Sequence, residues 1–146
     1  MRLALAVVAS LLLVAACGGG TVATQSAGPS VHDAWVRVPA GPGQPAAAYL
    51  TIDNPGDTPD VLVRVDAPTG LTCQLHQTAM DSAGMVGMNE LDQLDIPARG
   101  SVHLEPGGYH LMLTGAVGLK VGGTVELRLT FARAGTITVQ AEVRNS

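Results

Sequence analysis

Four residues in the second half of the chain carry side chains that could bind one metal ion: His76, Met88, His110 and Met112. In an extended strand successive side chains point to opposite faces, so His110 and Met112 leave the same face, roughly 6–7 Å apart at the backbone. Leu111 and Leu113 take the other face, toward a core, so we expect the imidazole and the thioether to lie on the outside of the protein. The imidazole of His76 takes the face opposite to the apolar residues that precede it. Imidazole and thioether are neutral ligands, and thioethers favour Cu(I) over Mg²⁺, Ca²⁺ or Zn²⁺. We therefore expect these four residues to coordinate Cu(I), with Cu(II) as a second candidate ion.

The methionines of the chain are clustered rather than dispersed. Apart from the initiator, all four lie between Met80 and Met112. Methionine used only to fill gaps in a core would be scattered along the chain. We expect Met80 and Met85 to serve as auxiliary or hand-off thioethers beside the four ligands.

The remaining histidines and the downstream cysteine have simpler interpretations. His32 and His103 are expected to be solvated, since neither has a methionine two residues away, although a histidine near a terminus can capture Cu(II). Cys73 shares its strand face with leucines and is expected to be a small buried residue. A blue-copper centre needs a thiolate beside two histidines and a weak axial methionine. Because Cys73 and His76 lie on opposite faces, the sequence does not favour such a centre.

The first residues form a targeting segment rather than part of the fold. Residues 1–16 contain Arg2 followed by an apolar run. This run is too short for a membrane-spanning helix, which needs about 20 residues. The run ends in Val14-Ala15-Ala16-Cys17-Gly18, which resembles a bacterial lipobox, so we expect Cys17 to carry a lipid; an ordinary secretory signal is the alternative. Residues 17–30 are expected to be a flexible tether, and residues 31–146 the folded domain. The protein would then be exported and anchored by its lipid, on the outer face of the cytoplasmic membrane or in the periplasm.

Composition and patterning favour an all-β domain. The chain has 146 residues, a net charge of −4 without a basic run, 18 glycines and 9 prolines. This length favours one domain, and the charge argues against a nucleic-acid partner. Short alternating segments between turn signals predict a β-sandwich or Greek-key barrel. The predicted strands are 32–38, 46–52, 61–65, 71–76, 85–91, 102–105, 109–113, 125–131 and 137–143. The three valines of 61–65 are expected to share one face, and 77–84 is expected to be a loop.

The spaced ligand pattern resembles that of the PCuAC family of bacterial periplasmic copper chaperones. His76 and Met88 are separated by eleven residues, Met88 and His110 by twenty-one, and His110 and Met112 by one. Further similarities are Pro106-Gly107-Gly108-Tyr109-His110-Leu111-Met112-Leu113, Ala34-Trp35-Val36-Arg37, and Ala47-Ala48-Tyr49 with Asn54. The chain departs from the family at Gln77, where many members have methionine, and at Met85, which is displaced by one position.

The resemblance implies a cupredoxin-like or immunoglobulin-like fold and a non-enzymatic function. It implies a protein that binds Cu(I) through His76, Met88, His110 and Met112, and we expect this protein to be a monomer. Such a protein passes the ion by ligand exchange to the CuA centre of cytochrome c oxidase subunit II or to a thioredoxin-like copper-assembly protein. Two alternatives are an electron-transfer cupredoxin and a metal-free immunoglobulin-like adhesion or binding lipoprotein. An enzyme is not expected, because no Ser/His/Asp or Cys/His arrangement has supporting context.

Overall fold

The computed structural model describes residues 27–115 and 118–145, and within them it contains strands and turns but no helix. No helix in these ranges is therefore long and apolar enough to cross a membrane. The expected signal peptide, the lipidated Cys17 and most of the expected tether lie outside the described residues. The ten strands are β1 (Ser30–Arg37), β2 (Ala46–Asn54), β3 (Asp60–Asp66), β4 (Thr72–Met80), β5 (Val86–Glu90), β6 (Leu94–Ile96), β7 (Gly100–Leu104), β8 (Tyr109–Thr114), β9 (Thr124–Phe131) and β10 (Gly135–Arg144).

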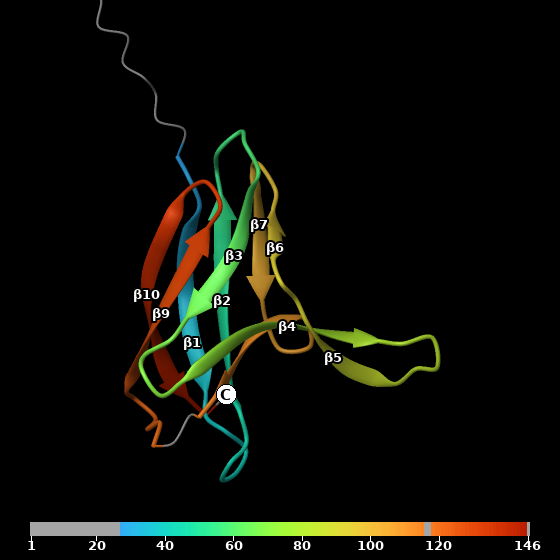
Figure 1. The fold of residues 1–146 in the computed structure, drawn as a ribbon, viewed down its shortest axis with the longest axis vertical. Coiled ribbons are helices and arrows are strands. Elements are labelled where there is room, and N and C mark those ends of the chain that lie inside the picture. The colour runs from blue at the N-terminus through green and yellow to red at the C-terminus, as the bar shows by residue number, and fades with distance from the viewer. Residues whose placement is uncertain (1–26, 116–117, 146) are drawn as a thin grey trace, which may run out of the picture.

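These strands form one sheet that curls around its own core (Figure 1). Its order is β5-β4-β8-β7-β2-β1-β10-β9-β3-β6. Most pairs are antiparallel, but β1 pairs with β10, and β7 with β8, in the parallel sense. The two ends of the sheet approach each other, since β3 also contacts β4, and β6 contacts β2 and β7. The predicted all-β, cupredoxin-like fold is confirmed.

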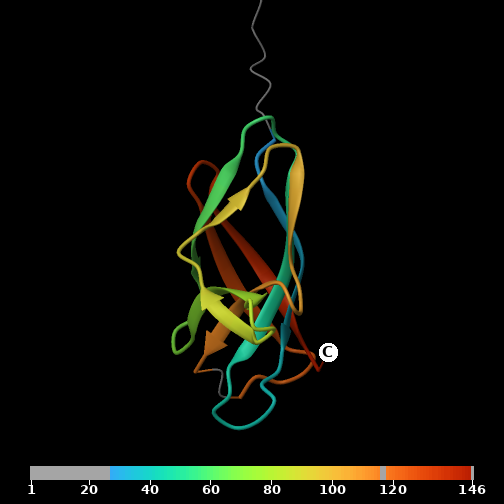
Figure 2. The ribbon, with the colours of Figure 1, turned by 90° about the vertical axis from the view of Figure 1, so that its right-hand side faces the viewer.

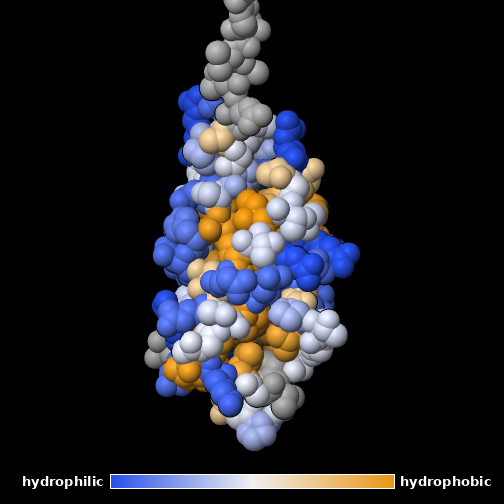
Figure 3. Space-filling view, turned by 90° about the vertical axis from the view of Figure 1, so that its left-hand side faces the viewer, coloured by the Kyte–Doolittle hydropathy of each residue, from blue (hydrophilic) through white to orange (hydrophobic). Residues whose placement is uncertain are grey.

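The inner face of the curled sheet holds the hydrophobic core. Alternate residues of the strands that surround the core point inward, as the pleat requires. Thus Leu111 and Leu113 of β8 are fully buried, and Leu127 and Leu129 of β9 face them from the other side of the core. The side of the molecule away from the β4–β5 hairpin shows a strip of apolar residues flanked by hydrophilic ones (Figure 3). Burial of alternate residues therefore fixes which side chains strands such as β8 and β9 present outward.

The outward residues of β2, β8, β4 and β5 fall in register on one continuous face. Residues directly opposite each other in paired strands share a face of the sheet. Met112 lies opposite both Ala47 of β2 and Gln74 of β4, and His110 lies opposite His76. On the other edge of β4, Thr78 lies opposite Met88. The register thus places all four predicted metal ligands on this outer face.

The hairpin of β4 and β5 extends beyond the body of the domain as an arm (Figure 1), which points toward the viewer in Figure 2. β4 pairs with β8 only as far as Gln77, while its pairing with β5 continues to Met80. The N–H of Thr78 donates to the carbonyl of Gly108 at 3.0 Å, which fixes the base of the arm to the turn before β8. β5 is the edge of the sheet, and all five of its residues are exposed.

The structure corrects three of the predicted elements. Residues 77–80 were expected to belong to a loop, but they continue β4 to Met80, because β5 supplies a pairing partner. β6 was not predicted, since three residues are too few to show an alternating pattern. The valines of β3 do not share a buried face: the register shifts between Leu62 and Arg64, so Leu62 is buried and Val63 is exposed.

Candidate metal centre

The two histidine rings lie side by side across β4 and β8. His76 and His110 are directly opposite in the antiparallel register. Their ring centroids are 5.9 Å apart, and the ring planes are inclined by 30°. Two imidazoles at this separation can approach one ion with modest rotation of their side chains.

The imidazole of His76 is buried without a hydrogen-bonding partner. The residue is 8% exposed, and both ring nitrogens lack a partner. Among the described residues these are the only buried side-chain nitrogen or oxygen atoms left unsatisfied. Such an atom costs about 1–3 kcal/mol in a folded protein, so it calls for a functional explanation. A metal ion bound by one of the nitrogens would provide it.

Burial also keeps this ring neutral. The pKa of His76 is lowered from its ordinary value by desolvation and, to a lesser degree, by His110, while Glu90 acts in the opposite direction. A neutral imidazole has the free lone pair that coordination requires. The same shift means that acidification through pH 6.5 destabilises the fold at this position, since the unfolded chain takes up the proton more readily.

His110 is positioned by a tight turn between β7 and β8. Pro106 and Gly107 occupy its two central positions, and Gly107 has a φ of 87°, which favours glycine. The N–H of Gly108 donates to the carbonyl of Glu105 at 3.0 Å, closing the turn. The Nδ1 atom of His110 lies 3.2 Å from the carbonyl oxygen of Gly108. Because a carbonyl only accepts, this bond places the proton on Nδ1 and leaves the Nε2 lone pair free.

His110 is not on the outside of the protein, contrary to our expectation from strand alternation. The residue faces outward from the sheet, yet it is only 6% exposed. The residues beside it cover it, and together they form a shallow cavity of about 270 Å³. This cavity is lined by Arg37, Pro45, Ala46, Ala47, Tyr49, Thr78, Met88, Pro106, Gly107, His110 and Met112.

Three of the four predicted ligands, Met88, His110 and Met112, thus line one cavity, and His76 lies beside it. Met112 is half-buried in the wall that β8 shares with β2, whereas Met88 of β5 is 64% exposed. Imidazoles from two strands and thioethers from two strands therefore converge on one region of the outer face. No group of three or more His, Cys, Asp or Glu side chains in the described ranges is placed to hold a metal ion, and the side chains that add sulfur donors to this region are Met88 and Met112.

The two auxiliary methionines lie farther out, and Cys73 lies on the other face. Met80 and Met85 are 70% and 69% exposed near the end of the arm, and neither lines the cavity. Cys73 is half-buried against the core, rather than fully buried as expected, and is directly opposite Leu113. Burial, aided by Asp66, raises the pKa of its thiol to about 12. Its sulfur lies on the face opposite to the candidate ligands, as strand alternation predicted.

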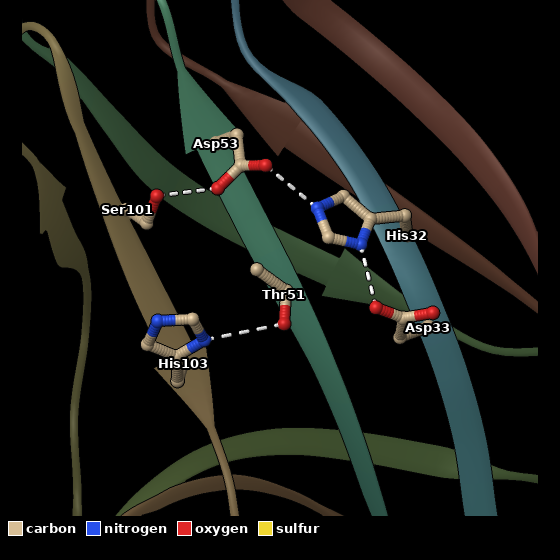
Figure 4. Close-up of polar contacts among 6 residues, drawn as sticks. All are labelled: His32, Asp33, Thr51, Asp53, Ser101 and His103. Carbon is tan, nitrogen blue, oxygen red and sulfur yellow. Dashed lines mark hydrogen bonds and ion pairs between the residues drawn. The ribbon is translucent and has the colours of Figure 1, made fainter.

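His32 and His103 lie in a second, polar cluster on the outer face of β1, β2 and β7 (Figure 4). His32 contacts Asp33 through Nδ1 at 2.8 Å and Asp53 through Nε2 at 2.7 Å. Ser101 donates to the other oxygen of Asp53, and His103 lies 3.3 Å from the hydroxyl of Thr51. Both histidines are exposed, as expected, but His32 is held in ion pairs rather than free in solvent.

The sequence did not show that Arg37 and Tyr49 line the cavity beside the candidate ligands. Tyr49 and Arg37 come from β2 and β1, with the guanidinium of Arg37 5.4 Å from the centroid of the Tyr49 ring. The Trp35 ring lies 4.7 Å from that of Tyr49, so an aromatic platform borders the thioethers. The segments around Trp35 and Tyr49 stand out as landmarks in the sequence, but only the strand register shows that they face the metal-binding residues.

Comparisons with known proteins place the chain in a family. The family model described as "Putative lipoprotein LpqE-like" matches residues 30–143. The chain belongs to the LpqE-like family. A relative of the LpqE-like chain, "Putative lipoprotein Lxx21020" of Leifsonia xyli subsp. xyli (strain CTCB07), is 30% identical over 126 residues, covering 86% of this chain and 75% of the relative.

Solved structures of PCuAC domains share the fold of this LpqE-like chain. The apo PCuAC domain from PmoF1 is 30% identical with a TM-score of 0.69, covering 83% of this chain and 97% of that domain. The Cu(I) form of DR1885 from Deinococcus radiodurans is 35% identical with a TM-score of 0.62, covering 90% and 87%. The copper-bound PCuAC domain from PmoF2 is 26% identical with a TM-score of 0.67, covering 83% and 96%. The domain is therefore of the PCuAC type, as the sequence resemblance indicated.

Proposed function

We propose that this LpqE-like protein is an exported, lipid-anchored copper chaperone that binds Cu(I) through His76, Met88, His110 and Met112. The observation that carries the proposal is the buried, unpartnered ring of His76 opposite His110. A cavity lined by the thioethers of Met88 and Met112 adjoins this pair. Two structural neighbours are copper-bound, and one of them is a Cu(I) form, which supports the choice of ion. Cu(II) is a secondary candidate.

Ligand exchange is the mechanism that this site favours. All four donors are neutral, so binding Cu(I) needs no deprotonated thiol and leaves one net positive charge at the site. Met88 is the most exposed of the four and lies on the edge strand, so an incoming ligand would displace its thioether first. The copper keeps its oxidation state and is never released to water. No catalytic step is required, so we propose a non-enzymatic carrier.

The first test is an anaerobic titration of the full chain with Cu(I) in competition with bicinchoninate. We expect one tightly bound Cu(I) per chain and no intense visible absorption after oxidation. A protein that takes up no Cu(I) would support the metal-free adhesion module, and strong thiolate-to-Cu(II) absorption would support the electron-transfer cupredoxin.

We propose that the chain is a monomer. Its acceptor is the CuA centre of cytochrome c oxidase subunit II or a thioredoxin-like copper-assembly protein. The Cu(I)-loaded chain is mixed with copper-free subunit II, and CuA absorption is recorded in samples oxidised with ferricyanide at successive times, because the fully reduced centre has no visible band. Absorption that develops faster than with Cu(I)–bicinchoninate alone is expected. If subunit II gains no copper but a thioredoxin-like protein does, the second acceptor is correct.

A further inference from the structure

The free edge of β5 is not protected against pairing with another strand. β5 is the last strand of the sheet, and all five of its residues are exposed (Figure 1). Proteins commonly protect such edges with proline, lysine or a bulge. β5 contains neither proline nor lysine, and its register with β4 runs from Glu90 to Val86 without a shift. The edge is therefore open to a further strand.

Two hydrogen bonds show which residues of the arm point their backbone groups toward β4. The N–H of Leu91 donates to the carbonyl of Leu75 at 2.8 Å, and the N–H of Asp81 donates to the carbonyl of Met85 at 2.9 Å. In an antiparallel ladder, the backbone groups of alternate residues point to opposite sides of the strand. The odd-numbered residues from Met85 to Leu91 therefore pair with β4.

The backbone groups of Val86, Met88 and Glu90 consequently point to the free edge. These are alternate residues, so their side chains also share one face of the hairpin. It is the face of the metal centre, because Met88 lies opposite Thr78 and Glu90 lies opposite His76. A strand added at this edge would place one of its own side chains beside Met88, with the two Cβ atoms about 4.5–5.5 Å apart.

The side chains of this edge indicate the chemistry of the added strand. Val86 and Met88 are 66% and 64% exposed, so they present apolar surface that the fold leaves uncovered. Glu90 accepts a hydrogen bond from Gln74, but within the described ranges it forms no ion pair. Residues 72–98 contain four carboxylates and no lysine or arginine. Like charge thus disfavours a second copy of the arm, whereas a basic segment complements it.

We propose that the copper acceptor adds an extended, basic segment to the free edge of β5, with a cysteine opposite Met88 and a basic residue opposite Glu90. This inference rests on the function proposed above. A bond from copper to the cysteine sulfur forms as the bond to the Met88 sulfur breaks, and the thiol proton passes to solvent. The ion remains Cu(I), so no oxidant is needed. The negative charge of a thiolate, which a thioether lacks, favours movement of copper toward the acceptor.

The probe for this edge is the peptide acetyl-Thr-Lys-Thr-Cys-Thr-Val-Thr-amide. Antiparallel pairing puts its lysine opposite Glu90, its cysteine opposite Met88 and its valine opposite Val86. Amide exchange with solvent is followed by NMR in the ¹⁵N-labelled, metal-free full chain under anaerobic conditions. Without peptide, the amides of these three residues should exchange several-fold faster than those of Gly87 and Asn89. With excess peptide, the three edge amides should become protected as well.

Copper transfer is measured by mixing the Cu(I)-loaded full chain with the peptide and determining copper in the peptide fraction after rapid gel filtration. Val86→Pro removes one edge N–H, and proline is tolerated where the N–H of an edge strand faces solvent. We expect this variant to transfer copper about tenfold more slowly, the effect of losing one hydrogen bond of ordinary strength. The matched control Val86→Thr retains the N–H and the branched side chain, so it should transfer copper as the wild type does.

A second peptide tests the register. Acetyl-Thr-Lys-Cys-Thr-Thr-Val-Thr-amide has the same composition, but its cysteine points to the other face of the hairpin, so it should accept copper more slowly. Equal rates with the two peptides, or for Val86→Pro and Val86→Thr, would overturn the inference. Edge protection that grows with protein concentration in the absence of peptide would show that the occupant is a second copy, which also overturns it.

Competition with bicinchoninate separates this inference from the proposed function. The wild type and both Val86 variants should bind one Cu(I) per chain with the same affinity. If the wild type binds Cu(I) but the peptide does not protect the edge amides, the inference is wrong and the proposed function stands. If the wild type binds no Cu(I), the proposed function itself fails.

Discussion

The four histidines of the chain form two pairs on the same outer face of one sheet, and the pairs differ in almost every other respect. His76 and His110 are buried beside thioethers, and His76 has no polar partner. His32 and His103 are exposed among carboxylates and hydroxyls, and both nitrogens of His32 are engaged (Figure 4). The surroundings, rather than the residue type or the strand, therefore decide what each imidazole can do.

The charge state of the two pairs follows from these surroundings. The pKa of His32 is raised, chiefly by its hydrogen bond to Asp53 and then by that to Asp33, which favours the imidazolium. The pKa of His76 is lowered, chiefly by burial, which favours the neutral ring. A protonated ring cannot coordinate a metal, whereas a neutral, unpartnered ring is ready to do so. One pair fits an ion-pair network, and the other fits a soft cation.

The largest contrast is expected in copper affinity. His76→Ala or Met112→Ala should weaken Cu(I) binding by at least about 100-fold, since loss of even an outer-shell partner costs 10–100-fold at metal sites. His103→Ala, in the polar pair, should leave the affinity unchanged. Competition with bicinchoninate measures all three, and circular dichroism confirms that each variant is folded. Tight stoichiometric binding by either of the first two variants would show that the ligand assignment is wrong.

A smaller contrast, of opposite sign, is expected in stability. His76→Leu removes a buried ring whose nitrogens lack partners, so the metal-free variant should gain about 1–3 kcal/mol in its free energy of unfolding. His103→Leu changes an exposed residue and should stay within about 0.5 kcal/mol of the wild type. Urea unfolding of the metal-free proteins gives both values. A destabilised His76→Leu variant would mean that the ring has a structural role that outweighs its lost hydrogen bonds.

The smallest effect is the pH dependence that the polar pair contributes to stability. His32 has a raised pKa, so its contribution to stability is complete below about pH 6.5 and disappears as the pH rises through the folded-state value. The pKa of Asp53 is lowered, chiefly by Ser101 and then by His32, so its contribution is complete above about pH 3.8 and disappears at lower pH. His32→Asn should therefore lower the melting temperature at pH 5 by a few degrees at most, because exposed ion pairs are weak.

At pH 9 the same substitution should have little effect, and His103→Asn should have little effect at either pH. Thermal unfolding of the metal-free proteins at the two pH values makes the comparison. An equal loss for His32→Asn at both values would show that the imidazolium does not contribute.

The sequence predicted the parts of the fold that depend on alternation. Leucines 111 and 113 had to face a core, which placed His110 and Met112 together on the other face, and the structure agrees. Alternation describes only one strand at a time, so it could not show that neighbouring strands cover His110. Nor could it find the register shift in β3, because Val61, Val63 and Val65 form an apparently regular pattern.

The residue types of the candidate centre could be predicted from the sequence, but the burial of its histidine rings could not. The spacing of the four ligands and the Pro106-Gly107 turn are visible in the sequence. The missing hydrogen bonds of His76 depend on what surrounds the ring in three dimensions. The arm was missed because residues 77–80 lack apolar alternation: β4 continues there through pairing with β5, not through burial.

The position of Cys73 on the inner face has a consequence for how the protein endures its surroundings. With a pKa of about 12 the sulfur remains a thiol at any physiological pH, and a thiol reacts far more slowly than a thiolate with disulfides and oxidants. In the folded domain this sulfur is therefore slow to form a mixed disulfide or to be oxidised. Cys73, the only cysteine after Cys17, is therefore far less reactive than an exposed cysteine, whereas the thioethers of Met80, Met85 and Met88 are accessible to solvent.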